Sequence, residues 1–173
     1  PEAVKLASLI IEMRERPEFN VKTLVTAQHR EMLDPILERF DIRPDYDLDL
    51  MRPDQSLFGL TSRAIEQLEE PLKDAKPDIV LVQGDTTTTF AGALAAFYLK
   101  IPVGHVEAGL RTGNRYSPFP EEINRVLASR IAAINFCPTE RAKQNLLREG
   151  TAPESIHVTG NTGIDTLLLV ASR

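Results

Sequence analysis

Hydrophobic positions along the chain follow two different periods. In the segment 56–75 they recur at the spacing of one helix face: Leu57, Leu60, Ala64, Leu68 and Leu72. The run Asp78–Val82 is instead almost continuously apolar, which is typical of a strand that is buried on both faces of a sheet. The two patterns follow each other along the chain and predict a succession of strands and helices.

The same patterns assign the rest of the chain. Helices are predicted over 1–13, 30–40, 56–75, 86–99, 120–131, 139–148 and 161–172. Strands are predicted over 21–26, 45–50, 78–82, 102–106, 133–137 and 155–158, and a Gly/Pro/Asn-rich loop over 109–118. Such alternation indicates an α/β fold with a parallel, doubly wound sheet.

Composition narrows the class of protein. The 173 residues are 42% hydrophobic and 26% charged, as in a globular domain. No run of 18 or more apolar residues occurs, so no membrane span is expected. A net charge of −5 argues against nucleic-acid binding, and one cysteine excludes a disulfide framework. With three scattered histidines, no transition-metal site is expected, and we expect an acidic cytoplasmic protein.

Polar and glycine-containing turns follow the predicted strands at their carboxyl ends. These turns cover 26–30, 84–89, 107–112, 138–141 and 159–162. The connections at the opposite edge, such as 73–77, look like plain solvated turns. Ligands of open α/β sheets bind beyond the carboxyl ends of the strands, so the sequence predicts a site at this edge.

The turn after the strand 78–82 carries Gly84 and Asp85, followed by a run of threonines. Glycine permits a tight turn and close backbone approach, and threonine hydroxyls cap the helix that follows. Asp85 is therefore either a cap or an acid or base beside exposed helix N–H groups. The glycine and lysine spacing of a Walker motif is absent.

The next strand ends at Glu107, two residues after His105, which places both side chains on one face. Two interpretations remain open for Glu107. It forms a loop salt bridge with Arg111, or it is a carboxylate in a low-dielectric strand end that serves proton transfer.

Two further acids, Glu121 and Glu122, lie in the first turn of the helix 120–131. Acids there complement the helix dipole, which gives both a structural explanation. Pro118 and Pro120 stiffen the chain before them and fix the direction of the carboxylates, which a catalytic acid requires.

The remaining candidates carry less information. Lys5 lies in a first helical turn, where a cation opposes the dipole, and is either solvated or part of an anion site. His105 and His157 lie in apolar strands and are expected to pack there, whereas His29 lies in a loop and could contact a ligand. Cys137, inside a strand, is expected to be a buried apolar residue.

The motifs together resemble one family. In order along the chain they are Pro1-Glu2-Ala3-Val4-Lys5, Thr26-Ala27-Gln28-His29-Arg30-Glu31-Met32-Leu33-Asp34, Gly84-Asp85-Thr86-Thr87-Thr88-Thr89, Gly104-His105-Val106-Glu107-Ala108-Gly109-Leu110-Arg111-Thr112, Pro120-Glu121-Glu122-Ile123-Asn124-Arg125 and Thr159-Gly160-Asn161-Thr162. The chain resembles the bacterial and archaeal non-hydrolysing UDP-N-acetylglucosamine 2-epimerases over its whole length.

The resemblance implies an architecture. Family members have two Rossmann-like domains of the glycosyltransferase-B (GT-B) type with a cleft between them, and the chain resembles the N-terminal one. We expect residues 1–160 to form that domain without its first strand, and residues 161–173 to be a helix leading to the second domain. The resemblance also implies a homodimer for the full-length protein and an isolated chain with little or no activity.

The resemblance also implies a reaction, the interconversion of UDP-GlcNAc and UDP-ManNAc. UDP is eliminated to give 2-acetamidoglucal and is then re-added, with no metal or nicotinamide cofactor. By motif match, the catalytic acids are Asp85, Glu107 and Glu121. Residues expected to bind the substrate or sit near it are Lys5, Gln28, His29, Arg30, Arg111 and Glu122. The sequence does not decide which acid serves which face of the sugar.

Bacterial members also bind an activating UDP-GlcNAc near the segment 28–30. Glu31 and Asp54 stand where some members have Gln and Arg, and acidic residues there disfavour a pyrophosphate. Two other functions remain as alternatives: another nucleotide-sugar enzyme, such as a glycosyltransferase or a hydrolysing epimerase, or a non-catalytic binding module. The downstream pathway is open.

Overall fold

The computed structural model describes residues 2–27, 30–52 and 54–171. The chain divides into two compact units. Unit 1 comprises Pro1–Asp54 and Asn161–Arg173, and unit 2 comprises Gln55–Gly160. The last helix thus belongs to the same unit as the first segment of the chain, and the domain expected over 1–160 stays a prediction.

Unit 1 contains three helices and a short parallel pair of strands among its described residues. Its elements are α1 (Glu2–Arg14), β1 (Leu24–Val25), α2 (Arg30–Arg39), β2 (Tyr46–Asp47) and α7 (Thr162–Ala171). Helices α1 and α7 pack together, and Thr166 Oγ1 donates to the Val4 carbonyl at 2.8 Å. Strands β1 and β2 are shorter than the predicted 21–26 and 45–50 and form a sheet of their own.

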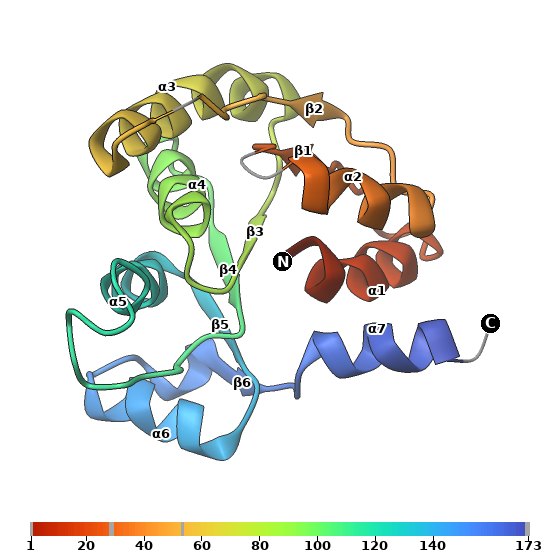
Figure 1. The fold of residues 1–173 in the computed structure, drawn as a ribbon. Helices are drawn as coiled ribbons and strands as arrows, with labels where there is room; N and C mark the ends of the chain where they lie inside the picture. Colours follow the sequence, from red (N-terminus) through yellow and green to blue (C-terminus); the bar gives the residue numbers. More distant parts are fainter. Residues whose placement is uncertain (1, 28–29, 53, 172–173) are drawn as a thin grey trace. The chain divides into compact units, whose positions relative to one another are not determined.

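Unit 2 holds a four-stranded parallel sheet in the order β3-β4-β5-β6. Its elements are α3 (Leu57–Ala75), β3 (Val80–Gln83), α4 (Thr87–Tyr98), β4 (Val103–Val106), α5 (Glu121–Ile131), β5 (Ile134–Cys137), α6 (Glu140–Arg148), the 3-10 turn η1 (Pro153–Ser155) and β6 (Ile156–Val158). Figure 1 shows the alternation of these strands and helices. The predicted parallel α/β class is confirmed in each unit. Within the described part of the chain, no helix combines the length and hydropathy that crossing a bilayer requires.

Three helices of unit 2 begin where hydroxyl side chains predict. Ser56 accepts from the N–H of Gly59, Thr86 from that of Thr89, and Thr139 from that of Ala142. Each bond satisfies an N–H group that has no partner within its helix. All three helices therefore begin with defined first turns. Those of α4 and α6 lie just beyond the strands β3 and β5.

The core of unit 2 lies between the sheet and its helices. Helix α4 packs against both α3 and α5. Small side chains such as Ala93, Ala96 and Ala128 pack there with Val82 and Val103. A second cluster lies under α6 and includes Cys137, which is fully buried, as predicted.

Two packing predictions are wrong. His157 was expected to pack inside its strand but is exposed, because β6 is the last strand of its sheet. In the predicted helix 120–131 the apolar residues Ile123, Val126, Leu127 and Ile131 recur at helical spacing and are expected to face inward, yet Leu127 is 40% exposed. Helix α5 instead buries polar side chains, among them Glu122, Asn124 and Ser129. This reversal marks the surroundings of the candidate site.

Candidate active site

Two of the candidate acids lie at the carboxyl end of the four-stranded sheet, as predicted. Asp85 follows β3 and Glu107 follows β4, and these strands are neighbours in register, with Gln83 opposite Val106. Glu121 is the first residue of α5 and is partly buried. All three belong to unit 2.

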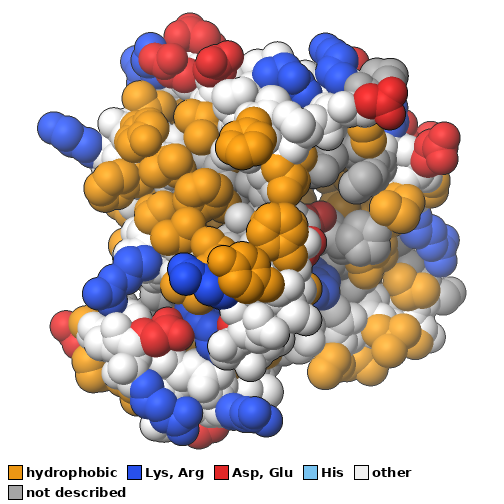
Figure 2. Space-filling model, turned by 60° about the vertical axis from the view of Figure 1, so that its left-hand side comes forward, with side chains coloured by type: hydrophobic (Ala, Val, Ile, Leu, Met, Phe, Trp, Pro, Cys, Tyr) orange, Lys and Arg blue, Asp and Glu red, His pale blue; other side chains and the backbone are white. Residues whose placement is uncertain are grey.

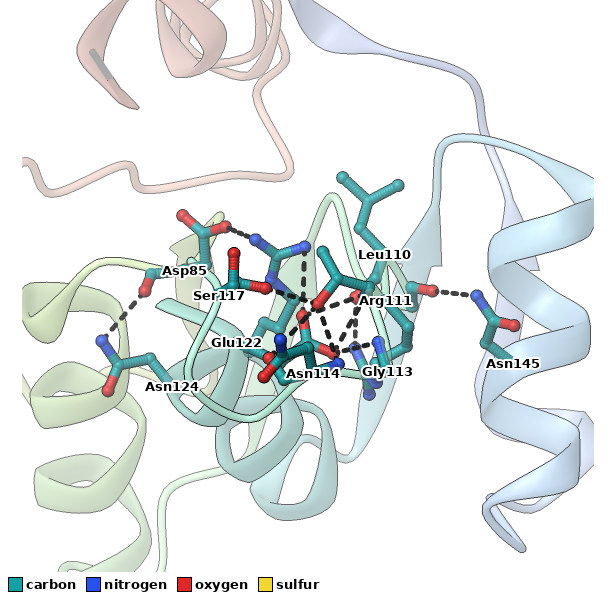
Figure 3. A network of polar contacts seen from close by, with 12 residues as sticks. Asp85, Leu110, Arg111, Gly113, Asn114, Ser117, Glu122, Asn124 and Asn145 are labelled. Carbon is teal, nitrogen blue, oxygen red and sulfur yellow. Dashed lines mark hydrogen bonds and ion pairs between the residues drawn. The ribbon is translucent and has the colours of Figure 1, made fainter. Parts of the chain in front are cut away.

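Asp85 is held by two consecutive residues of α5 (Figure 3). Arg125 Nη2 donates to Asp85 Oδ2 at 2.6 Å, and Asn124 Nδ2 donates to the Asp85 carbonyl at 3.0 Å. A charge-assisted bond of this length, in a partly buried position, orients a carboxylate strongly. The backbone and side chain of Asp85 are therefore both fixed by the helix that begins at Glu121.

Glu107 has an uncommon backbone conformation. Its φ of 67° lies in the left-handed region, which costs a residue with a side chain free energy and which clusters at functional sites. Its Oε2 accepts a hydrogen bond from Gln83 Nε2 at 2.7 Å. The side chain is thus directed toward the end of β3, beside the turn that carries Asp85.

Glu122 holds the loop that precedes α5. It is 3% exposed, and its carboxylate accepts from the N–H groups of Thr112 and Gly113, at 3.0 Å each to Oε1. Burial alone would raise the pKa of Glu122, but the N–H groups of Gly113 and Thr112, together with Arg125, outweigh it and leave the pKa below its usual value. The oxygens of Glu122 thus hold the loop, and the substrate contact expected for this residue stays a prediction.

The loop between β4 and α5 is closed by further internal bonds (Figure 3). Thr112 Oγ1 donates to the Ser117 carbonyl at 2.6 Å, and Asn145 Nδ2 of α6 donates to the Gly109 carbonyl at 2.9 Å. The Glu122 N–H donates to the Pro118 carbonyl at 3.1 Å. The segment that leads into Glu121, the first residue of α5, is therefore braced.

Arg111 is engaged with an acid that the sequence did not suggest. Its Nε and Nη2 donate to Glu149 Oε1 and Oε2 at 2.8 and 2.9 Å, and its Nη1 donates to the Leu110 carbonyl. Its side chain is only 9% exposed. Arg111 thus ties the loop to the end of α6 in a bidentate pair, with Glu149 as its partner in place of Glu107. Its contact with the substrate stays a prediction.

His105 is buried within its strand beneath the turn that carries Asp85, and its packing there is as predicted. It is fully buried, with Nε2 at 2.7 Å from the Gly84 carbonyl and Nδ1 at 3.0 Å from Ser129 Oγ. Burial, opposed by the bond to Gly84, lowers the pKa of His105 to about 4. The ring is therefore neutral near pH 7, with Nε2–H donating to Gly84 and Nδ1 accepting from Ser129.

Because the pKa of His105 is lowered in the folded protein, we expect the stability of the protein to depend on pH. Above its ordinary pKa of 6.5, His105 is neutral in both states; below it, the unfolded chain binds a proton that the folded chain refuses until about pH 4. The free energy of unfolding should therefore fall by about 2–3 kcal/mol between pH 7 and 4.5.

Urea denaturation across this range measures the effect. The lowered pKa of Glu122 takes effect as the pH falls through the ordinary value of 4.5, at the lower edge of this range. His105→Gln should flatten the slope, whereas replacing the exposed His157 by Gln should leave it unchanged. Equal slopes in all three proteins would contradict the assignment.

The remaining predicted residues belong to unit 1. Lys5 lies in the first turn of α1, as predicted. Arg30 begins α2 and pairs with Asp47 at 2.8 Å, with Asp49 at 3.4 Å and with Asp34 at 3.6 Å. The hydrogen bond to Asp47 raises the pKa of Arg30 most. Its charge is thus already offset by acids. Gln28 and His29 lie outside the described residues.

Four residues that matter to this geometry were missed: Gln83, Asn124, Arg125 and Ser129. A signal for Gln83 was present, because an amide that ends an otherwise apolar strand is out of place in a core. For Asn124, Arg125 and Ser129 of α5 there was no such signal, because the apolar pattern of this helix predicted that other residues face inward. Among the described residues, no group of three or more His, Cys, Asp or Glu side chains could hold a metal ion.

Comparison with known proteins gives a consistent result. Residues 11–173 match the sequence profile of the family described as UDP-N-acetylglucosamine 2-epimerase. The chain is 59% identical over 167 residues to the Bacillus subtilis UDP-N-acetylglucosamine 2-epimerase, covering 96% of this chain and 44% of the relative. It is 58% identical over 173 residues to the enzyme of the same name from Salmonella typhimurium, covering 100% of this chain and 46% of the relative.

A solved structure agrees. The crystal structure of UDP-GlcNAc 2-epimerase from Neisseria meningitidis bound to UDP-GlcNAc superposes with a TM-score of 0.96 at 54% identity, over 99% of this chain and 46% of that one. The chain therefore spans about half the length of the relatives it matches, and its fold is that of the matching part of these GT-B-type proteins.

Proposed function

Because the chain belongs to the UDP-N-acetylglucosamine 2-epimerase family, we propose that the full-length protein interconverts UDP-N-acetylglucosamine and UDP-N-acetylmannosamine. The observation that carries this proposal is the arrangement at the end of β3 and β4. There, Asp85 and Glu107 follow neighbouring strands, and Asp85 is tied to the first turns of α5, where Glu121 lies.

The proposed chemistry has two halves. In the first, a base removes the proton from C2 while the C1–O bond to UDP breaks, which yields 2-acetamidoglucal and UDP. In the second, UDP adds again at C1 and a proton returns to C2 from the opposite face. The reaction therefore needs a proton acceptor and a proton donor on the two faces of the sugar. Asp85, Glu107 and Glu121 are the proposed acids, and their placement by a rigid sheet and a braced loop suits this task.

The proposed contacts with the nucleotide sugar also include residues of unit 1. Lys5, in the first turn of α1, is proposed to lie near the substrate, because a cation in that position is unfavourable for the helix by itself. Gln28, His29 and Arg30 remain proposed ligands of a UDP-sugar. The acids around Arg30 offset its charge, which supports the expectation that a second, activating UDP-GlcNAc binds weakly here.

The test is the identity of the product. The full-length protein, incubated with UDP-GlcNAc and followed by proton NMR, should give a mixture of UDP-GlcNAc and UDP-ManNAc. Release of free ManNAc with UDP would identify a hydrolysing epimerase instead, and transfer of the sugar to an added acceptor would identify a glycosyltransferase. An unchanged substrate would leave the non-catalytic module as the better description.

We also propose that the full-length protein forms a homodimer in the cytoplasm. Figure 2, in which the side of α3, α4 and α5 comes forward, shows hydrophobic side chains gathered on this face of unit 2. The large exposed ones on these helices are Leu57, Phe58, Phe97, Tyr98 and Leu127. Apolar surface of this kind supports association with a second copy, which sedimentation velocity would detect. The single, buried cysteine fits a reducing compartment.

A further inference from the structure

Gln83, the last residue of β3, is in direct contact with one of the proposed catalytic acids. Its side chain is 4% exposed, and its Nε2 donates to Glu107 Oε2 at 2.7 Å. We propose that Gln83 is the positioning residue that holds the Glu107 carboxylate in its working orientation. The inference rests on the proposed function, because it gives Gln83 a role only through Glu107.

Gln83 is itself held firmly. It lies opposite Val106 in the parallel ladder of β3 and β4, and its carbonyl accepts from Thr89 Oγ1 at 2.6 Å. Thr89, in the first turn of α4, is only 3% exposed. Because the backbone of Gln83 is fixed on both sides and its amide is shielded from water, its donor has a defined position. A buried amide also loses free energy if it is left without a partner, so its bond to Glu107 is maintained.

Glu107 is the residue whose carboxylate the Gln83 amide contacts. It lies one residue beyond β4 in the left-handed region, with φ 67°, and it leads into the loop. Its Oε2 lies over the Gly84 turn, 3.8 Å from the position that a Cβ on Gly84 would take. A glutamate side chain has several rotatable bonds, so a donor with a defined position, such as the Gln83 amide, restricts where its carboxylate lies.

The consequence concerns the chemical step more than binding. A misplacement of a reacting group by about 1 Å costs on the order of 100-fold in rate, because proton transfer requires close and aligned atoms. An interaction that serves only to aim the carboxylate lowers kcat when it is removed and leaves KM nearly unchanged. A purely structural role would instead lower the amount of folded protein without this division.

The test is Gln83→Met in the full-length protein, assayed with UDP-GlcNAc. Methionine has nearly the same shape as glutamine and lacks the N–H donor. We expect kcat to fall about 10- to 100-fold with KM changed by less than about 3-fold. Gln83→Asn, which keeps an amide but withdraws it by one carbon, should give a smaller loss of kcat and serves if the methionine variant does not fold.

Gln144 of α6 offers a matched control. Its Nε2 donates to Glu140 Oε1 at 3.0 Å, the same kind of bond on an exposed helix surface. Gln144→Met should therefore keep full activity. If Gln83→Met is as active as Gln144→Met, or if it raises KM with kcat unchanged, the proposal is wrong.

A double variant shows whether Gln83 acts through Glu107. In Glu107→Asp the carboxylate is withdrawn from Gln83, so adding Gln83→Met should lower kcat by less than about 2-fold. A second full loss would overturn the proposal. Its failure is distinguishable from failure of the proposed function, because in that case the parent protein itself would not convert UDP-GlcNAc into UDP-ManNAc.

Discussion

Asp85→Asn in the full-length protein should lower the rate of epimerisation by about 10²–10⁴-fold, the range for removal of a group that transfers a proton. Asparagine has the same shape and keeps the backbone carbonyl that Asn124 binds, but it neither accepts nor donates the proton in the same way. Glu107→Gln should give a loss of similar size. Initial rates with UDP-GlcNAc, measured by NMR or by a coupled assay, check both.

Two features of this experiment separate chemistry from folding. Asp85→Asn also removes the ion pair with Arg125, so its thermal unfolding must be compared with that of the parent protein. Glu154, an exposed acid in η1, supplies the control, since Glu154→Gln should leave the rate unchanged. Rates within a few-fold of the parent for both site variants would show that these acids are caps and salt-bridge partners only.

Gly109→Ala should destabilise the protein by about 3–5 kcal/mol, the sum expected for backbone strain and for overpacking. Gly109 has φ 85°, a conformation that L residues rarely adopt. A Cβ there would press into the carbonyl oxygen of Ala142 and would lie 2.8 Å from its carbonyl carbon. Because these are backbone atoms of α6, they cannot turn away as a flexible side chain would.

Gly113 provides the matched control in the same loop. It has φ 79°, and no described atom lies within 4 Å of the Cβ that alanine would add. Gly113→Ala should therefore cost only the conformational strain, about 1 kcal/mol. Denaturant unfolding of both variants measures the difference. Equal losses would mean that α6 does not pack against the loop as closely as the structure indicates.

Much of the fold was predictable because local signals agreed with the tertiary structure. The hydroxyl caps at Ser56, Thr86 and Thr139 mark helix starts, and the apolar runs mark β3 and β4. The first strands were overestimated, since β1 and β2 pair over only two residues each. Side chains alone do not show how far a ladder extends, because pairing depends on the neighbouring strand.

The sequence predicted where the candidate acids lie in the fold, but not which residues contact them. Asp85 and Glu107 could be found because each lies in a turn directly after a predicted strand, and the end of a strand can be located from the sequence alone. Their partners come from other elements: Gln83 from the neighbouring strand and Arg125 from α5. Helical periodicity predicts that the apolar residues of α5 face inward. The buried polar groups of the site need hydrogen-bond partners, however, so α5 buries polar residues there as well.

We propose that the carboxylates at the end of β3 and β4 exchange the proton at C2 of UDP-GlcNAc. Incubating the full-length protein with UDP-GlcNAc in D₂O tests this, with deuterium at C2 followed by NMR in the parent, Asp85→Asn and Glu107→Gln proteins. We expect deuterium at C2 of both epimers with the parent protein and little or none with either variant. Epimerisation that retains the original C2 proton, or undiminished exchange in both variants, would show that these carboxylates do not exchange it.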